Sequence, residues 1–439
     1  MTKRMLLAIL LLIVFALPAG CQKQGGEPTQ PTAPAPTILP THTPEPSPTP
    51  TPDPVGEALA GMTVEQKGAP VWNQLLVAGI EGTEPGEDAV QAVQGYQVGG
   101  VILFGRNVES AEQLAALTNG LKELNGDYTP LFLCVDQEGG RVDRMPPEVT
   151  DLPSALDFGS IADPEARMDA CFTLGQTLAA QCAAFGFNMD FAPSLDIWSN
   201  PENTVIGDRA FGTDAATVTG AANETALGIL SGGVIPVAKH FPGHGDTAVD
   251  SHYGLPGVDK SLEELEELEL RPFRQAIDTT CVYGTYGGDT SIPAIMVAHI
   301  LLSQIDPDNP ASLSPEVVTG LLREEMGYEG VVCTDDLTMG AISNTYGMGE
   351  AAVLAVEAGC DLLLVCHGAD NLAEAHAALV EAVDSGCIPE ERLDESVYRV
   401  LSLKTVYGLS NAPVEAPDIE ALNDRIAALE RSIEADTSQ

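Results

Sequence analysis

Short, continuously apolar runs alternate with longer amphipathic segments along most of this 439-residue chain. A run without polar interruptions is typical of a strand that is buried on both faces. Strands that alternate with helices pair in parallel through right-handed crossovers. The pattern therefore predicts an α/β fold, a (β/α)8 TIM-type barrel in a single domain, with a doubly wound open sheet as the alternative. The apolar runs are residues 74–80, 99–105, 130–135, 187–191, 234–240, 294–300, 330–334 and 361–367, and the amphipathic segments include 111–124, 164–185, 262–277 and 315–326.

The first 21 residues have the organisation of an export signal. Lys3 and Arg4 precede an apolar run of 12 residues, Leu6 to Leu17, which is too short to span a bilayer comfortably. Small residues then lead to Cys21 and resemble a bacterial lipobox, in which the cysteine is lipidated, although Pro18 departs from the usual aliphatic residue. We expect residues 1–21 to be a lipoprotein signal peptide and the protein to be extracytoplasmic, lipid-anchored to the bacterial cell membrane through Cys21.

Composition sets the remaining boundaries. Residues 22–55 are rich in Pro and Thr, which cannot build a core and favour extended polyproline II, so we expect a disordered tether. The barrel domain is expected over 56–410. Residues 411–439 are too few for a second domain, and we expect a short helical or disordered tail there.

Charge and cysteine content exclude other classes. Lys and Arg number 20 against 64 Asp and Glu, for a formal net charge of −44, which excludes nucleic acid as the main partner. None of the nine cysteines forms a CxxC pair, so we expect no disulfide framework. We expect a monomer that reaches the membrane through its lipid alone.

Polar residues follow several of the predicted strands. In a barrel the carboxyl ends of the strands converge on one mouth, where reactive side chains gather. The residues at or just past the ends of the apolar runs are Asp136, Lys239, His240, His299, Asp335 and His367.

The stretch 239–256 holds three of the seven histidines. One interpretation is a metal site, but the segment is too rich in Gly and Pro for helical ligand spacing, and we expect no metal. A phosphate-binding loop is a weaker interpretation, because Gly243 and Gly245 are not followed by the third glycine of that motif. Asp250 and His252 lie two residues apart, so in an extended loop both side chains point to one side, and the carboxylate can orient the imidazole for acid–base work. A loop held by its own hydrogen bonds is the remaining interpretation.

Two further stretches carry candidate residues. The run 330–334 ends in Asp335 and Asp336; strand alternation predicts that only one faces the mouth, where a carboxylate suits attack on a sugar, and that the other caps the next helix. Asp136 and the arginines of 135–144 form either a hydroxyl-binding set or an ion pair, and Arg209 follows the fourth run.

These stretches resemble glycoside hydrolase family 3, in its β-N-acetylglucosaminidase (β-N-acetylhexosaminidase) branch, over roughly residues 58–409. The sequence Lys-His-Phe-Pro-Gly-His-Gly-Asp-Thr, followed by Asp-Ser-His, is the most specific motif. Residues 321–337 resemble the nucleophile signature, with Cys333 where a larger aliphatic residue is commoner. The resemblance implies that Asp335 is the nucleophile and that His252 is the general acid/base with Asp250 as its partner. It also assigns sugar binding to Asp136, Arg144, Arg209, Lys239 and His240.

The same resemblance implies an activity. It is that of a retaining exo-glycosidase, which releases terminal non-reducing β-linked N-acetylglucosamine through a covalent glycosyl-aspartate and needs no cofactor. The expected partners are carbohydrate substrates, N-acetylglucosaminides and muropeptides from peptidoglycan turnover. The alternatives are a β-glucosidase of the same fold, against which the Asp250–His252 pair argues, and a catalytically inactive sugar-binding surface lipoprotein.

Overall fold

The computed structural model describes residues 53–62, 71–278 and 292–437. The predicted signal peptide, Cys21 and nearly all of the predicted tether lie outside these ranges. The predicted end of the tether at residue 55 is wrong, because Pro54 and Val55 belong to a helix. The described part begins with the capping residue Asp53, whose carboxylate accepts from the Gly56 N–H at the start of α1 (Pro54–Ala60). None of the helices in the described ranges is long and apolar enough to cross a membrane.

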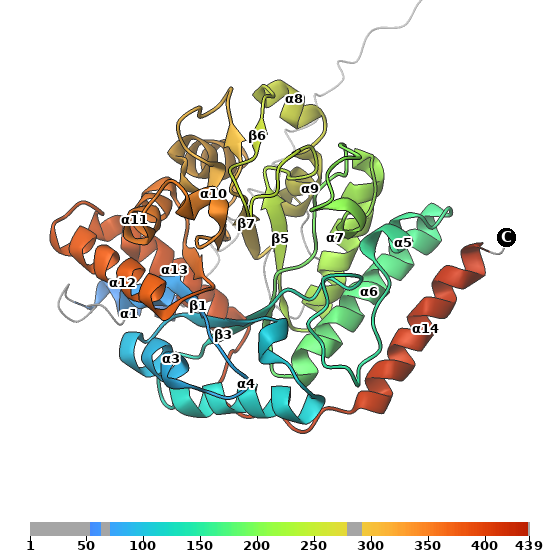
Figure 1. Cartoon of the computed structure of the whole chain (residues 1–439), viewed down its shortest axis with the longest axis horizontal. Helices are drawn as coiled ribbons and strands as arrows, with labels where there is room; N and C mark the ends of the chain where they lie inside the picture. The colour runs from blue at the N-terminus through green and yellow to red at the C-terminus, as the bar shows by residue number, and fades with distance from the viewer. Residues whose placement is uncertain (1–52, 63–70, 279–291, 438–439) are drawn as a thin grey trace, which may run out of the picture. The chain divides into compact units, whose positions relative to one another are not determined.

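Parallel strands close into a barrel in chain order, each hydrogen-bonded to the next and the last to the first (Figure 1). Each strand coincides with one of the predicted apolar runs, so the predicted (β/α)8 barrel is confirmed and the open-sheet alternative is wrong. The barrel strands are β1 (Leu76–Gly79), β2 (Gly100–Leu103), β3 (Phe132–Val135), β4 (Met189–Asp190), β5 (Ile235–Phe241), β7 (Ala294–Val297), β9 (Val331–Asp336) and β10 (Leu362–Val365). A separate parallel pair joins β6 (Gly257–Val258) to β8 (Leu301–Leu302).

Helices surround the barrel (Figure 1). They are α3 (Glu87–Val90), α4 (Ala111–Asn125), α5 (Ala155–Gly159), α6 (Pro164–Ala184), α7 (Ala215–Ser231), α8 (Leu262–Glu267), α9 (Arg271–Asp278), α10 (Gly340–Ser343), α11 (Met348–Ala358), α12 (Ala369–Asp384), α13 (Glu390–Val406) and α14 (Ile419–Thr437). The π-helical segments are Gln91–Tyr96 and Glu316–Glu325, and the 3-10 turns are Asn73–Leu75, Gly105–Asn107, Gly207–Arg209 and Ala311–Leu313.

Local chemistry sets several helix boundaries. Helix α6 begins where Asp163 accepts from two backbone N–H groups and Pro164 occupies the first turn, the usual pattern of a helix start. The predicted helix 262–277 is instead two helices, α8 and α9, and the predicted helix 315–326 is π-helical over Glu316–Glu325. Apolar periodicity identifies the buried face of a helical segment. It does not reveal where the helix is interrupted or whether its turns are α-helical or π-helical.

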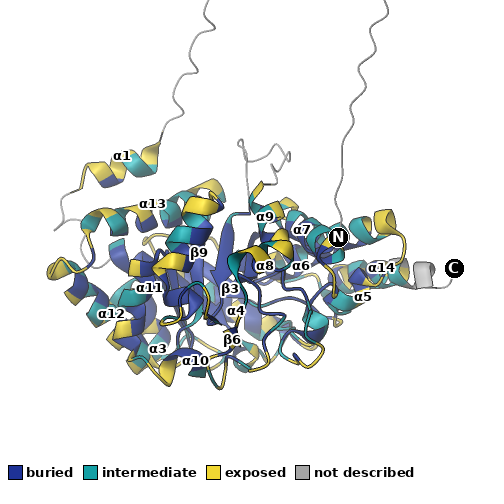
Figure 2. Cartoon of the chain, turned by 90° about the horizontal axis from the view of Figure 1, so that it is seen from above, coloured by how far each residue is buried: buried dark blue, intermediate teal, exposed yellow. Residues whose placement is uncertain are grey.

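Two apolar layers form the core. Inward-facing side chains such as Val77, Phe132 and Met189 fill the barrel, and Val400 and Leu403 of α13 belong to the same apolar cluster. Outward-facing strand residues pack against the helices, and Figure 2 shows the buried strands inside helices whose outer faces are exposed. The described cysteines are free, and six of these seven are buried like the apolar residues around them.

The tail expected over 411–439 contains a helix. Leu422, Ile426 and Leu429 of α14 are buried, and Arg425 donates to Thr177 Oγ1 of α6 over 3.1 Å. Helix α14 therefore belongs to the compact part of the chain.

Candidate active site

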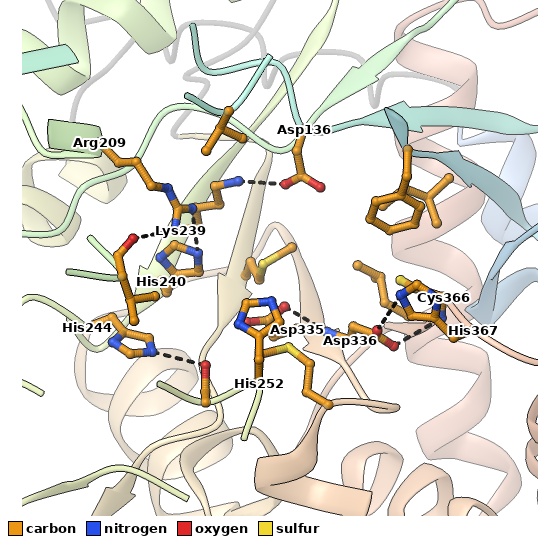
Figure 3. Close-up of a pocket in the computed structure, with 18 of the residues that line it drawn as sticks. Asp136, Arg209, Lys239, His240, His244, His252, Asp335, Asp336, Cys366 and His367 are labelled. Carbon is orange, nitrogen blue, oxygen red and sulfur yellow. Dashed lines mark hydrogen bonds and ion pairs between the residues drawn. The ribbon is translucent and has the colours of Figure 1, made fainter. Parts of the chain in front are cut away.

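A cavity of about 230 Å³ lies at the carboxyl ends of the barrel strands. Its lining includes every residue predicted for catalysis or sugar binding except Asp250, which contacts the lining residue His252. Figure 3 shows Asp335 in the middle of this group, with Arg209, Lys239 and His240 on one side and Cys366 and His367 on the other. The lining residues are Ile102, Phe104, Asp136, Val142, Arg144, Val205, Arg209, Lys239, His240, His244, Ser251, His252, Met296, Asp335, Asp336, Met339, Leu364, Cys366 and His367.

Consecutive residues on two strands both reach this cavity. On β9, the four residues from Cys333 to Asp336 lie opposite only three residues of β10, from Leu362 to Leu364. Strand β5 carries the same extra residue between Ala238 and Phe241. An extra residue interrupts the alternation of side chains and re-aims them, which is a common device at barrel rims. The prediction that only one of Asp335 and Asp336 faces the mouth is therefore wrong.

The two aspartates differ in how they are bonded. Asp336 accepts from Cys366 N and Thr338 N at 3.0 and 2.9 Å and from Thr338 Oγ1 at 2.6 Å. It holds a turn and the neighbouring strand, and it does not cap a helix as predicted. Within the described ranges, Asp335 accepts a single hydrogen bond, from Asp336 N at 2.8 Å. Asp335 is the carboxylate that the fold leaves available.

The surroundings of Asp335 lower the pKa of its carboxyl group. Burial would raise the pKa of this carboxyl, but His299, His240 and the hydrogen bond from Asp336 N outweigh burial and lower it. His299 is itself buried below the site, contacting Ser312 Oγ at 2.6 Å and Asp336 O at 3.0 Å. Although His299 follows an apolar run as predicted, it is not among the residues that line the cavity, and its effect on the site is to lower the pKa of Asp335.

Asp250 and His252 form the predicted pair. Asp250 Oδ1 lies 2.7 Å from His252 Nδ1 and accepts from the His252 backbone N–H at 2.9 Å. Burial would raise the pKa of Asp250, and these two hydrogen bonds lower it instead. The imidazole side chain is 63% exposed, so its Nε2 edge is open to a ligand while the carboxylate fixes the other nitrogen.

A buried network of charges forms the opposite wall. Lys239 Nζ lies 2.7 Å from Asp136 Oδ1 and 2.6 Å from Glu138 Oε1. Arg209 donates to both oxygens of Glu138, at 2.8 and 2.7 Å. Burial would raise the pKa of Glu138, but the two cations hold it well below its usual value. Glu138 is absent from the predicted site, although its place two residues after Asp136 at a strand end was a usable signal.

A second unpredicted carboxylate supports His240. Asp196 is fully buried; its Oδ2 lies 2.6 Å from His240 Nδ1 and its Oδ1 accepts from His244 N at 2.6 Å. Burial would raise the pKa of Asp196, but His240 and His244 lower it to about 2. A carboxylate within the apolar sequence 191–197 was the signal that could have identified it.

The other polar residues of the stretch 239–256 form contacts of their own. His244 contacts Ser251 and Thr247, and Asp246 pairs with Lys260. Over the described ranges, His, Cys, Asp and Glu side chains do not assemble into a group of three that could hold a metal. Arg144 lines the cavity, and its buried Nε lacks a hydrogen-bond partner in the described structure.

Known proteins resemble this chain over the whole barrel. The model of the glycosyl hydrolase family 3 N-terminal domain matches residues 63–403. A β-hexosaminidase of Nitrosomonas eutropha is 35% identical over 331 residues, covering 74% of this chain and 91% of that protein.

Solved structures agree with this likeness. The family 3 β-N-acetylglucosaminidase of Paenibacillus is 40% identical with a TM-score of 0.76, over 85% of this chain and 69% of that one. The zinc-bound CbsA of Thermotoga neapolitana is 29% identical with a TM-score of 0.64, over 77% and 68% of the two chains.

Proposed function

The chain belongs to glycoside hydrolase family 3 and is a glycosidase, and we propose that it is a retaining exo-enzyme that removes terminal, non-reducing β-linked N-acetylglucosamine. One observation carries the proposal: an available carboxylate, Asp335, and an oriented imidazole, His252, share one small cavity with a charged wall. A cavity of about 230 Å³ is below the usual range for ligand pockets, which suits a single terminal sugar. Relatives named β-hexosaminidase and β-N-acetylglucosaminidase support the sugar class.

In the first step Asp335 attacks the anomeric carbon. A bond forms between a carboxylate oxygen and this carbon while the bond from the carbon to the leaving oxygen breaks. The nucleophile must be ionised, and the lowered pKa of Asp335 meets this requirement at neutral pH. The product of the step is a covalent glycosyl-enzyme, and the configuration at carbon 1 is inverted once.

His252 moves the proton in both steps. It donates a proton to the leaving oxygen and then takes one from the water that attacks the glycosyl-enzyme, which restores the original configuration. Most retaining enzymes use a second carboxylate for this task. An imidazole serves here because Asp250 holds its Nδ1 at 2.7 Å and so favours proton transfer at Nε2.

The charged wall binds the sugar hydroxyls. Lys239 and Arg209 offer donors, and Asp136 offers acceptors at the cavity surface. Glu138 and Asp196 lie behind them and fix Arg209 and His240. Because these groups are already paired and buried, they are oriented before the substrate arrives, which limits the entropy cost of binding.

A metal has no step to perform in this reaction. With a nucleophile and an acid/base residue supplied by the protein, no Lewis acid is required. The zinc reported for CbsA makes the point testable. Full activity after exhaustive chelation supports the proposal, and loss that zinc restores selectively would contradict it.

The sequence before the barrel suggests where the enzyme works. We infer that Cys21 carries lipid and that residues 22–52 form a tether. We also infer that the substrates are peptidoglycan fragments outside the cytoplasm and that the enzyme acts as a monomer. The rival β-glucosidase activity is separated by comparing a nitrophenyl N-acetylglucosaminide with the matching glucoside. At least 100-fold preference for the glucosaminide is expected, and preference for the glucoside would refute the sugar assignment.

A further inference from the structure

The loop that carries the acid/base pair rests on the segment that follows the nucleophile strand. We call residues 250–253 the dyad loop and residues 340–344 the seat. Two backbone N–H groups and one side-chain amide of the seat donate to carbonyls of the dyad loop. These hydrogen bonds run from Gly340 N to His252 O (3.1 Å), from Ala341 N to Ser251 O (2.9 Å) and from Asn344 Nδ2 to Tyr253 O (3.1 Å).

The seat is firmly connected to the nucleophile. Strand β9 ends at Asp336, and Met339 N donates back to Asp336 O at 3.0 Å. Thr338 is held by the Asp336 carboxylate. The turn between Asp335 and the seat is thus closed by hydrogen bonds at several points, so the position of the seat is set relative to Asp335.

Gly340 allows the two segments to approach this closely. A Cβ at this residue would lie 2.6 Å from His252 O and 3.0 Å from Tyr253 C, and both of these are backbone atoms. Contacts below 3.0 Å with backbone cannot be relieved by a rotamer change, so the dyad loop would have to shift. Gly340 is not among the residues of positive φ, and the need for glycine is therefore one of space.

The dyad loop is held on its other side as well. Ser251 is buried, and its Oγ lies 3.2 Å from His244 Nε2. Ser251 is thus fixed between His244 and the seat, while the neighbouring His252 side chain remains exposed toward the cavity. This arrangement anchors the backbone of the loop and leaves the imidazole free to act.

We propose that Gly340 and Asn344 are positioning residues, which hold the Asp250–His252 pair at the separation from Asp335 that proton transfer to the leaving oxygen requires. This inference rests on the acid/base role proposed for His252. Misplacing an acid matters most for poor leaving groups, because their departure needs the proton, whereas a nitrophenolate leaves without it.

The test compares five proteins on two substrates. Wild type, His252→Ala, Gly340→Ala, Asn344→Ala and Gly347→Ala are assayed with an alkyl N-acetylglucosaminide and with its nitrophenyl counterpart. Gly347→Ala is the matched control, because its Cβ would meet only the Glu374 side chain, at 3.4 Å. For Gly340→Ala we expect kcat/KM to fall about 100-fold on the alkyl substrate and less than about 5-fold on the nitrophenyl one. Asn344→Ala, which removes a hydrogen bond without adding volume, should give a weaker version of the same split.

Each result decides the matter. If His252→Ala shows the split and both Gly340→Ala and Asn344→Ala behave like Gly347→Ala, the seat inference is wrong and the proposed function stands. Equal losses on both substrates in Asn344→Ala, with thermal stability unchanged, would also overturn it. If His252→Ala itself shows no split, the acid/base assignment fails and the inference fails with it.

Discussion

At the scale of single residues, the site depends on carboxylates that are buried and still charged. Asp196 shows how this is achieved, because His240 and His244 both contact it and lower its pKa to about 2, from an ordinary value of 3.8. A carboxyl whose pKa is depressed in the folded state stabilises that state above its unfolded pKa. The contribution disappears as the pH falls through the folded value.

This linkage predicts the behaviour of Asp196→Asn. At pH 7 the variant should lose about 2 kcal/mol of unfolding free energy, the equivalent of a shift of nearly two pKa units. The difference in unfolding free energy between the variant and wild type should become smaller as the pH falls from about 4 toward 2. Urea unfolding across this range measures it, with the exposed Asp127→Asn as the control. A gap that stays constant with pH would show that Asp196 is not the depressed carboxylate described above.

At the scale of elements, close packing decides which glycines are required. Helices α6 and α7 approach each other at Gly175 and Gly228, where a Cβ on Gly228 would lie 2.2 Å from Phe172 O. Gly220 lies in the same helix, and a Cβ there would meet only the end of the flexible Met168 side chain. Alanine substitutions at Gly228 and Gly220 therefore distinguish the effect of packing on stability from the effect of helix propensity.

Gly228→Ala should therefore destabilise the barrel by about 1–3 kcal/mol, the usual cost of overpacking. Helix propensity alone would predict that replacing Gly by Ala raises the free energy of unfolding by about 1 kcal/mol. Gly220→Ala should come close to this gain, because the Met168 side chain can move away. Thermal unfolding of the two variants gives the comparison. Equal stabilisation by both substitutions would mean that the helices can separate at no cost.

The sequence pattern predicted the strands correctly because a buried parallel strand is a continuous apolar run that can be recognised from its own residues. It also placed Asp136, Lys239, His240 and Asp335 at one mouth, since barrel topology brings strand ends together. The sugar-binding roles of Arg144 and Arg209 and the acid/base role of His252 came from the family resemblance. The extra residues on β5 and β9 escaped prediction because a bulge has no composition of its own; it exists only in the pairing with β7 and β10. Glu138 and Asp196 were missed for a related reason, as their importance lies in partners far away in sequence.

At the scale of the whole molecule, a compact barrel follows an N-terminal segment of quite different composition. The barrel buries its apolar residues, whereas the first 55 residues combine a basic start, an apolar run and a Pro-rich stretch around Cys21. A formal net charge of −44 offers no attraction to an anionic membrane surface. Retention at a membrane would therefore depend on covalent lipid.

Cys21→Ser should abolish lipidation, and with it either retention at the membrane or cleavage of the signal peptide. In fractionated bacterial cells the wild-type protein is expected with the membranes and the variant in the soluble fraction, or membrane-bound with its signal peptide uncut. Cys387→Ser, which changes an exposed thiol of the barrel domain, should fractionate like wild type. Wild-type protein that carries no lipid and is soluble would refute the anchor and would indicate that Pro18 prevents processing.

The central claim is that Asp335 forms a covalent bond with the sugar, and trapping tests it most directly. The protein is incubated with a 5-fluoro N-acetylglucosaminyl fluoride, which slows the second step, and is then digested with pepsin, because trypsin would leave Asp335 and Asp336 in one long peptide. Fragment ions should locate the sugar on Asp335; Asp336→Asn should still be labelled and Asp335→Ala should not. A sugar found on Asp336, or turnover by Asp335→Ala at the wild-type rate, would contradict the account.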